Sequence, residues 1–190
     1  MSEVYIKEDA GLSLDRANKL LAGIGNSSGV FKAVHAALRR AAQSAKAKAG
    51  TFASSRYYIS AGGFKGHVVD KIAMEGGAHA GGVTGVKLTF AGSVIRLIEF
   101  NTRFSRDGGV AVSVKRGSGG VIANGFIANT GRFGVYERVG PSRLPIEQKF
   151  GPSAAHMMMD EQVTSKMEQQ IVETFNERID HEVDRILNGW

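Results

Sequence analysis

Cysteine is absent from this chain of 190 residues, and tryptophan occurs once. Without thiols, the chain forms no disulfide, no thiolate metal site and no cysteine nucleophile. It also lacks any apolar run near the roughly 20 residues that cross a bilayer, and its first residues lack the basic-then-apolar order of a signal peptide. We therefore expect a soluble protein of the cytoplasm, or of an assembly made there, with no membrane partner.

Proline is scarce but concentrated, because all three prolines lie between residues 141 and 152. Glycine is frequent, with 25 residues, and 43% of the chain is hydrophobic. This length and composition support the buried core of one domain. The glycines predict many turns, and we expect the glycine-rich loops to become ordered only on assembly.

The net charge of +6 is unevenly distributed. Residues 1–70 carry +5 (ten Lys or Arg against five Asp or Glu), residues 71–146 carry +6 (ten against four), and residues 147–190 carry −5 (four against nine). A basic body with an acidic tail suggests electrostatic head-to-tail contacts between copies, or docking on an oppositely charged ring. A solvated surface with uneven charge is the alternative.

The first part of the chain has helical periodicity. A short helix is predicted at 13–22, with Ser13 as its N-cap. A longer one is predicted from about 29 to about 48, with a further turn or two beyond Gly50, because apolar residues recur there at spacings of three and four and alanine is abundant. Residues 63–73 are predicted as a third, short helix.

From residue 83 the period changes to two, and β-branched residues become frequent, which predicts strands. Tight turns are predicted at Ala91–Gly92 and at Asp107–Gly108. We expect four or five strands in one mostly antiparallel sheet. The predicted strands are 86–90, 94–100, 109–116, 121–128 and 133–139.

Helical periodicity returns at the end of the chain. Ser153 is the predicted N-cap of a helix that runs to about Leu187, and acidic residues cover much of its surface. A helix of this length exceeds what a small sheet needs, so we expect it to project or to pack across a subunit boundary. Its apolar stripe is Val163, Met167, Ile171, Phe175 (or Thr174), Ile179, Val183 and Ile186.

These patterns predict the α+β class: N-terminal helices, a mostly antiparallel sheet of four to five strands, and a long C-terminal helix. We expect one domain over residues 1–190. Its predicted parts are a helical segment (1–75), the β-sheet (83–147) and the C-terminal helix (153–187).

Motifs for catalysis or cofactor binding are incomplete in this sequence. The loop from Gly23 to Gly29 resembles a phosphate loop, but a polar amphipathic helix precedes it where a buried strand is needed. His181 is followed four residues later by Arg185, so the second ligand of a zinc helix is missing. The five histidines have no ligand spacing. We expect no enzymatic activity, no cofactor and no metal.

One predicted helix has a basic face, formed by Lys32, Arg39, Arg40, Lys46 and Lys48. Clustered positive charge is enough for non-specific contact with phosphates. No known DNA-reading motif accompanies it, so a solvated face or a protein contact is favoured over proximity to DNA.

Residues 121–155 combine glycines, the three prolines, and arginines beside aromatic side chains. Short strands and tightly specified turns are expected there. Arginine beside aromatic residues is typical of interface anchors, although strand alternation alone also places such residues on two faces. We expect both roles, with one face in the core and the other in contact with partners. The candidate interface residues are Arg132, Phe133, Tyr136, Arg138, Arg143, Pro145 and Ile146.

Three stretches carry a resemblance to a known family: RYYISAGGFKGHV, GVAVSVKR, and GFIANTGRFGVYERVGPSRLPIEQKFGPSAAHMM. The last contains a Phe-Ile strand, a glycine turn, a V-x-x-R strand and an Arg-Leu-Pro-Ile corner that leads to Phe-Gly-Pro-Ser. Together they resemble the minor tail protein Z family, the tail-completion proteins of tailed bacteriophages and prophages. The resemblance covers roughly residues 30–187 and is most specific in its last third. The chain is less basic than some relatives and has a glycine-rich segment at 76–85.

The resemblance implies a structural function: completion of the head-proximal end of a phage tail, so that the tail joins a filled head. It implies a virion protein of the tail or neck, assembled in the bacterial host cytoplasm. A ring of about six copies is implied, closed by heterologous contacts. The implied partners are further copies of the chain, the tail tube, and the tail-terminator or head-connector proteins.

Two alternatives remain open from the sequence. The first is a nucleic-acid-binding module that uses the basic helix at 32–48 and binds duplex DNA with a steep dependence on salt. The second is a hydrolase in which His35, His67 or His156 comes together with a carboxylate.

Overall fold

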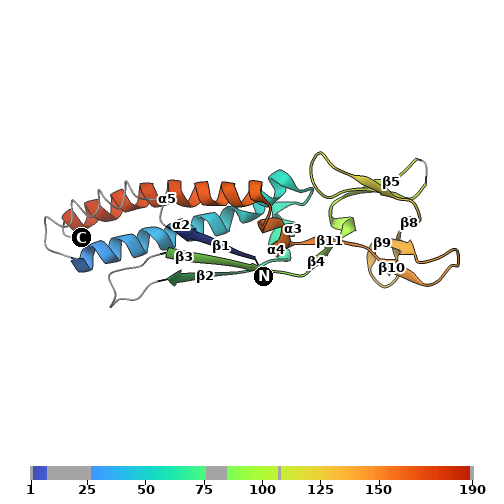
Figure 1. Cartoon of the computed structure of the whole chain (residues 1–190), viewed down its shortest axis with the longest axis horizontal. Helices are drawn as coiled ribbons and strands as arrows, with labels where there is room; N and C mark the ends of the chain where they lie inside the picture. Colours follow the sequence, from blue (N-terminus) through green and yellow to red (C-terminus); the bar gives the residue numbers. More distant parts are fainter. Residues whose placement is uncertain (1, 8–26, 76–84, 107, 189–190) are drawn as a thin grey trace. The chain divides into compact units, whose positions relative to one another are not determined.

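The computed structural model describes residues 2–7, 27–75, 85–106 and 108–188 (Figure 1). Its contacts cluster into two compact units, which are described separately below. Each unit combines segments that are distant in the sequence, so the units do not follow the predicted division at 1–75, 83–147 and 153–187. The single domain stays a prediction. Unit 1 consists of 50–69 and 90–163, and unit 2 of 2–49, 70–89 and 164–190.

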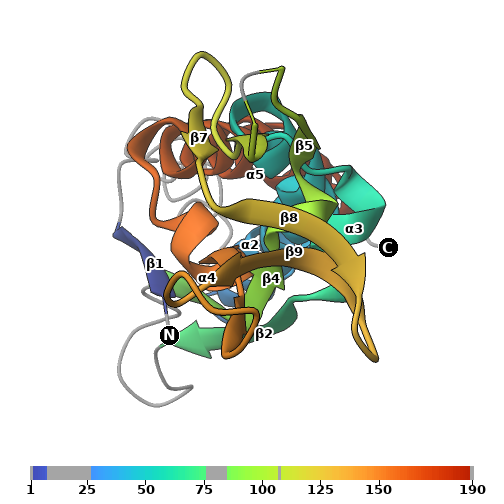
Figure 2. The same cartoon turned by 90° about the vertical axis from the view of Figure 1, so that its right-hand side faces the viewer.

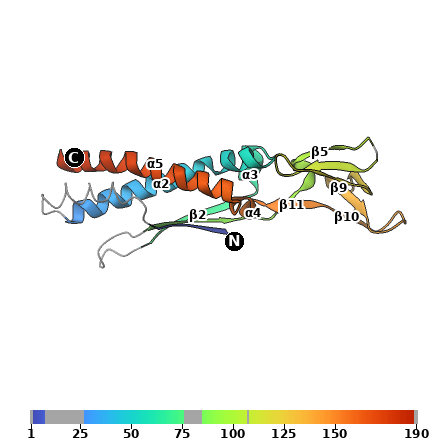
Figure 3. The same cartoon turned by 45° about the horizontal axis from the view of Figure 1, so that its top comes forward.

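Two long helices dominate unit 2. These are most of α2 (Ser27–Arg56) and of α5 (Glu161–Leu187), which lie side by side in Figures 1 and 3. The predicted helix at 29–48 and the further turns predicted beyond Gly50 are confirmed, as one continuous helix. Small alanine side chains permit close packing of the two backbones. The buried alanines of α2 in this unit are Ala33, Ala37, Ala41, Ala42, Ala45 and Ala49.

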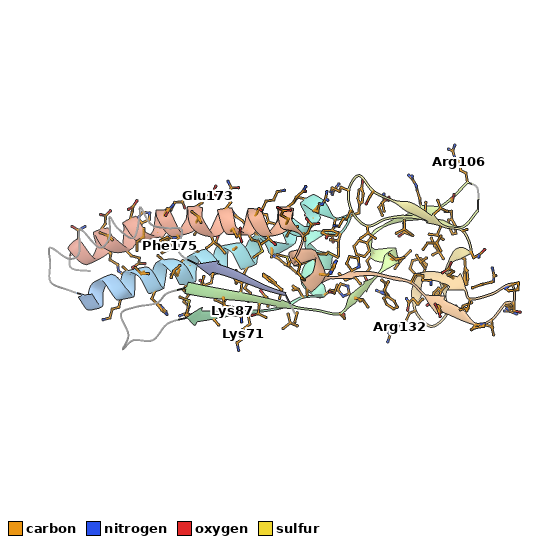
Figure 4. The ribbon with its side chains drawn as sticks, in the orientation of Figure 1. Lys71, Lys87, Arg106, Arg132, Glu173 and Phe175 are labelled. Carbon is orange, nitrogen blue, oxygen red and sulfur yellow. The ribbon has the colours of Figure 1, made fainter. Side chains whose placement is uncertain are left out.

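The apolar stripe predicted for the C-terminal helix is buried from Val163 to Val183, and the side chain of its last member, Ile186, lies outside the described residues. Within unit 2, Met167, Ile171, Phe175, Ile179 and Val183 are all at most 4% exposed. Figure 4 shows Phe175 on the side of α5 that faces α2, and Glu173 on the outer side. The stripe is therefore covered within this chain, and packing of another face of the helix across a subunit boundary stays a prediction.

A small sheet completes unit 2. Strands β1 (Ser2–Lys7), β3 (Gly85–Ala91) and β2 (Val69–Glu75) pair in the order β1-β3-β2. The predicted strand at 86–90 is therefore confirmed. The helix predicted at 63–73 is wrong beyond its first turns, since α3 (Ala61–Gly66) ends before β2 begins. Pairing with β3 outweighs the weak helical pattern there, and β1 is a further strand within the segment predicted as helical.

Unit 1 begins with the last turns of α2, which continue through Gly50. A Cβ at Gly50 would lie 2.8 Å from the carbonyl oxygen of Ala61, so this close approach requires glycine. Helix α3 follows, and Ser60 caps it by accepting a hydrogen bond from the Gly63 amide at 2.9 Å.

The segment predicted as a strand at 94–100 is only partly extended. It forms β4 (Val94–Arg96) and a 3-10 turn, η1 (Leu97–Glu99), and β4 pairs antiparallel with β11 (Phe150–Ser153). The predicted turn at Ala91–Gly92 does not join a hairpin, because β3 and β4 belong to different sheets. Gly92 instead lies so close to the His67 carbonyl that a side chain there would collide with it.

Two further antiparallel sheets complete the strands of unit 1. The first sheet is β5 (Asn101–Phe104), β6 (Val110–Ser113) and β7 (Gly120–Ile122), and the second is β8 (Gly125–Asn129), β9 (Phe133–Arg138) and β10 (Ile146–Gln148). Strand β6 matches the prediction at 109–116 and β9 the one at 133–139, whereas 121–128 divides into β7 and β8. Strands β5, β10 and β11 were not predicted.

The last helix is interrupted near its start. Ser153 is an N-cap, as predicted, but it caps the short α4 (Ala154–Met158), by accepting a hydrogen bond from the His156 amide at 3.1 Å. The chain then turns at Met159–Asp160 before α5 begins. Asp160 accepts a hydrogen bond from the Gln162 amide at 3.2 Å and so caps α5.

The α+β class is confirmed. The strands are distributed over small sheets, and among the residues that the structure describes no sheet has more than three strands, whereas one sheet of four or five was predicted. Several predictions lie outside the described residues: the helix at 13–22, most of the loop after Gly23, most of the glycine-rich segment at 76–85, and Asp107 of one turn.

Candidate functional site

The connection between β9 and β10, residues 139–145, forms an exposed loop that we call the hairpin tip. The Val139 amide donates a hydrogen bond to the Pro145 carbonyl at 3.2 Å, and Arg138 pairs with Ile146 just outside the loop. These contacts close the loop at its base. Nevertheless Val139 is 59% and Leu144 is 66% exposed, so two large aliphatic side chains face solvent on a loop that is held in shape.

A stacked column of side chains supports this tip. The Phe126 and Tyr136 rings are directly opposite each other on β8 and β9, with centroids 6.0 Å apart and an interplanar angle of 26°. The Arg138 guanidinium lies over the Phe126 ring, 5.0 Å from its centroid. Figure 2 shows β8 and β9 as a paired ribbon. The cation–π contact holds Arg138 in one orientation while its side chain remains exposed.

The structure separates the predicted interface residues along β9. Arg132 and Phe133 lie at the β8–β9 turn, where Phe133 is 54% exposed. Arg138 and Arg143 lie at the other end of β9, and six strand residues span about 17 Å. The candidates therefore occupy two turns of one sheet instead of a single patch.

Tyr136 belongs to the core and not to the exposed surface. It is 6% exposed, and its hydroxyl donates a hydrogen bond to the Arg132 carbonyl at 2.7 Å. Its assignment as a contact residue is corrected, because it lies in the middle of β9, where Gly134 and Val135 are buried as well. Its side chain supports Phe126 and the turn. Ile146 is half-buried, whereas Pro145 and Arg143 are exposed.

The carboxylates of this sheet are already paired. Lys149 Nζ lies 2.7 Å from a Glu137 oxygen and 3.4 Å from a Glu147 oxygen. The hydrogen bond to Glu137 is the main reason that the pKa of Lys149 is raised above its usual value. Because Lys149 occupies these two carboxylates, the nearby Arg132, Arg138 and Arg143 have no ion-pair partner among the described residues.

The predicted basic face of α2 does not remain one continuous surface. Lys46 Nζ lies 3.1 Å from an Asp70 oxygen on β2, and Lys48 Nζ donates to the Gln170 side chain at 2.6 Å. Lys32 and Arg39 are exposed. Internal contacts thus occupy part of the charge proposed for DNA.

Arg40, the fifth residue of that face, borders a polar groove between α2 and α5 in unit 2. The groove has a volume of about 530 Å³. Its walls carry both signs of charge, so it does not favour an anion or a cation. The lining residues are Arg40, Gln43, Ser44, Lys48, Gln170, Glu173, Thr174, Glu177 and Arg178.

Sequence reasoning missed a charged cluster around Asp160 in unit 1. The Asp160 side chain is 8% exposed, and one of its oxygens lies 2.8 Å from Lys115 Nζ and 3.5 Å from Arg56 Nε. The Tyr57 hydroxyl donates to the same oxygen at 3.3 Å. The hydrogen bond from Lys115 is the main cause of the lowered pKa of Asp160, while burial raises the pKa of Tyr57.

No local signal could reveal this cluster, because its members come from three separate segments of the sequence. Asp160 connects the end of α2, the strand region after β6, and the turn before α5. Its contacts satisfy a nearly buried carboxylate. The arrangement is that of a structural junction.

One histidine does meet a carboxylate, as the hydrolase alternative requires. His67 Nε2 lies 2.7 Å from Glu99 Oε2. Burial alone would raise the pKa of Glu99, but hydrogen bonds from His67 and Arg96 outweigh it and the pKa is lowered. Arg96 Nε donates to Glu99 Oε1 at 3.0 Å. Both carboxylate oxygens are thus engaged, and the pair connects α3 to η1.

Metal binding and membrane crossing find no support in the described parts of the chain. Within those ranges, no group of three or more His, Asp or Glu side chains is placed to hold a metal ion. Of the helices described, none combines the length and the hydrophobicity that a bilayer crossing requires.

Comparisons of the chain with protein-family models, with curated proteins and with solved structures gave no match. The resemblance to the tail-completion family therefore stays a prediction. The candidate functional site is the hairpin tip, together with the β8–β9 turn.

Proposed function

We propose that this chain is a structural protein of a phage or prophage virion, which completes the head-proximal end of the tail and supports its joining to the head. It acts without catalysis, as a ring of about six copies. Its partners are the tail tube and the tail-terminator or head-connector proteins, and it is assembled in the bacterial cytoplasm.

The observation that carries this proposal is the hairpin tip. It coincides with the VGPSRLP segment, the most specific part of the sequence resemblance. A loop that exposes Val139 and Leu144 beside two arginines has the residue mix of a protein contact. A small-molecule site would instead be a concave pocket with converging polar groups.

The distribution of exposed apolar side chains also supports a contact function for unit 1. Among the described residues, every large hydrophobic side chain that is strongly exposed belongs to that unit. Exposed apolar groups of this kind mark interaction surfaces when they gather. They are Val69, Val94, Phe104, Val121, Phe133, Val139, Leu144, Phe150 and Met159.

The test is removal of the gene from the phage or prophage that encodes it. We expect filled heads and complete tails to accumulate separately in electron micrographs, and joined particles to return when the gene is supplied in trans. Mass spectrometry of purified wild-type particles should detect the chain. Normal numbers of joined, infectious particles without the gene would contradict the proposal.

A hairpin-tip variant connects this function to the candidate site. Val139→Ser with Leu144→Ser removes two exposed aliphatic groups and leaves the core untouched. We expect a folded protein with an unchanged melting temperature that fails to restore joining. Thr51→Ala, an exposed change on α2, is the control and should restore joining fully.

A further inference from the structure

Unit 1 carries exposed arginines, and helix α5 carries exposed carboxylates, that form no ion pair among the described residues. In unit 1, four carboxylates already contact cations, and the exposed arginines remain without ion pairs among the residues described. The paired carboxylates are Glu99, Glu137, Glu147 and Asp160. The exposed arginines without an ion pair there include Arg103, Arg132, Arg138 and Arg143.

Helix α5 shows the reverse situation. Glu173, Glu177, Asp180 and Asp184 are all exposed and follow one another at spacings of four, three and four residues. We call this line the acidic stripe. Such spacing places them on one helix face, over about 16 Å. None of the four forms an ion pair within the described part of the chain. Like charges at these spacings repel one another, so a bound cationic surface would relieve them.

We propose that the hairpin tip of one copy docks on the acidic stripe of a second copy, with Arg138 and Arg143 facing the carboxylates. This inference rests on the proposed function, since it supplies the contact that would connect the copies of the ring. Tip and stripe are different surfaces, so each copy uses one of each, and repetition of the contact closes a ring when the rotation from copy to copy adds up to a full turn.

Charge complementarity on a single chain is the reason to choose a second copy as the occupant. An acidic helix face and an arginine-bearing loop are both present on every copy, and neither forms an ion pair among the described residues, although Glu173 accepts a hydrogen bond from Gln169 at 3.0 Å. The stack on Phe126 also prepares Arg138 for binding, because its side chain is already ordered. Val139 and Leu144 add apolar contact that a nucleic-acid backbone would leave uncovered.

Charge reversal tests the contact. The tip variant is Arg138→Glu with Arg143→Glu, and the stripe variant is Glu177→Lys with Asp180→Lys. Sedimentation velocity over a concentration series at low salt measures self-association, which in the wild type should weaken as salt rises. We expect each variant to associate at least tenfold more weakly than the wild type.

Mixing the two variants is the decisive step. Each carries the surface that complements the other, so an equimolar mixture should associate as strongly as the wild type. A contact within one chain would not be restored by mixing. Controls are Arg103→Glu, a single charge reversal outside the tip, and Glu168→Lys, an exposed residue about 140° around α5 from Glu173. Both should behave like the wild type.

Association that neither variant weakens, or that mixing fails to restore, overturns the proposal. Tip variants that lose only DNA binding overturn it as well. If the wild type is monomeric in solution, the absence of native cysteine allows a second measurement. Arg143→Cys with Asp180→Cys should form disulfides between copies in assembled particles, and their absence there refutes the contact.

These results separate the contact from the proposed function. Restored association with a chain that is absent from virions would support the docking and reject the tail function. Joined particles that require the gene but tolerate both charge reversals would support the function and reject the docking.

Discussion

The two units differ in where they place their large apolar side chains. Unit 2 encloses them, with the α5 stripe from Met167 to Val183 at most 4% exposed against an alanine-rich helix. Unit 1 also has a buried core, which includes Tyr57, Phe64 and Phe90. It nevertheless leaves large side chains on its strand edges and turns exposed, such as Phe104 at 70% and Leu144 at 66%.

The buried apolar side chains of unit 2 stabilise its fold, whereas the exposed ones of unit 1 are accessible to another surface. Burial of a Phe or Leu side chain stabilises a fold by about 1.5–3 kcal/mol, and exposure gives up that contribution. Unit 2 uses its apolar residues for its own packing and presents charge outside. Unit 1 keeps apolar side chains outside beside exposed arginines, and exposed apolar groups mark interaction surfaces when they gather.

The same substitution in both units should give the largest contrast. Phe175→Ala in unit 2 removes a ring that is 2% exposed, and we expect it to lower the free energy of unfolding by about 3–5 kcal/mol. Phe133→Ala in unit 1 removes a ring that is 54% exposed and should change it by less than about 0.5 kcal/mol.

Urea denaturation followed by circular dichroism measures both variants of this pair. Phe133→Ala should instead impair head–tail joining. A loss of stability of equal size in the two variants would show that the Phe133 turn belongs to the core, and the contrast between the units would disappear.

A glycine pair tests the packed part of unit 1. A Cβ at Gly151 would lie 2.7 Å from the ring of Phe100, which is 6% exposed. We expect Gly151→Ala to cost about 1–3 kcal/mol, because the ring must move within the core. The matched change Gly140→Ala, in the hairpin tip, meets no atom within 4 Å and should leave the melting temperature unchanged or slightly raised. Equal melting temperatures of both variants would contradict this packing.

Periodicity in the sequence predicted the regular elements of both units, though to different extents. In unit 2 the apolar stripe that includes Ile171, Phe175 and Ile179 repeats over many turns, so the sequence predicted both the helix and its buried face. In unit 1 the strands have three to six residues, too short for a period to define their pairing. The division of the strands into small sheets depends on pairings such as that of β4 with β11, two strands that are about 55 residues apart in the sequence.

The candidate site was predicted in composition but not in geometry. Its arginines, aromatics and prolines mark residues 132–146 as unusual. Only the folded sheet shows that Tyr136, in the middle of β9, is buried and that Phe133, at the first residue of β9, is exposed. The cluster around Asp160 could not be predicted, because its partners Arg56 and Lys115 come together only in the folded chain.

Asp160 gives the next smaller effect, and it is dependent on pH. Its pKa in the folded protein is lowered relative to the value of about 3.9 in the unfolded chain. The charged carboxylate therefore stabilises the fold at any pH above about 3.9. This stabilisation is lost as the pH falls through the lower, folded-state pKa. We expect Asp160→Asn to lower the free energy of unfolding by about 1–2 kcal/mol at pH 7. The difference from the wild type should shrink below about pH 4.

Urea denaturation at several pH values measures this effect. Asp180→Asn, an exposed change in unit 2, is the control and should lack the pH dependence. A constant difference between Asp160→Asn and the wild type from pH 7 to pH 3 would mean that shape, and not charge, makes Asp160 important.

The smallest expected effect concerns the charged surface of unit 2. Arg39 is exposed on α2, seven residues before Lys46, which contacts Asp70. We expect Arg39→Glu to change the free energy of unfolding by less than about 0.5 kcal/mol.

Since internal contacts already occupy part of the basic face, affinity for duplex DNA at 50 mM salt should be weak in the wild type and little changed in the variant. Fluorescence anisotropy with a labelled duplex measures this affinity. A steep salt dependence that Arg39→Glu reduces by about one charge would instead make unit 2 a nucleic-acid surface, and both units would then be contact surfaces.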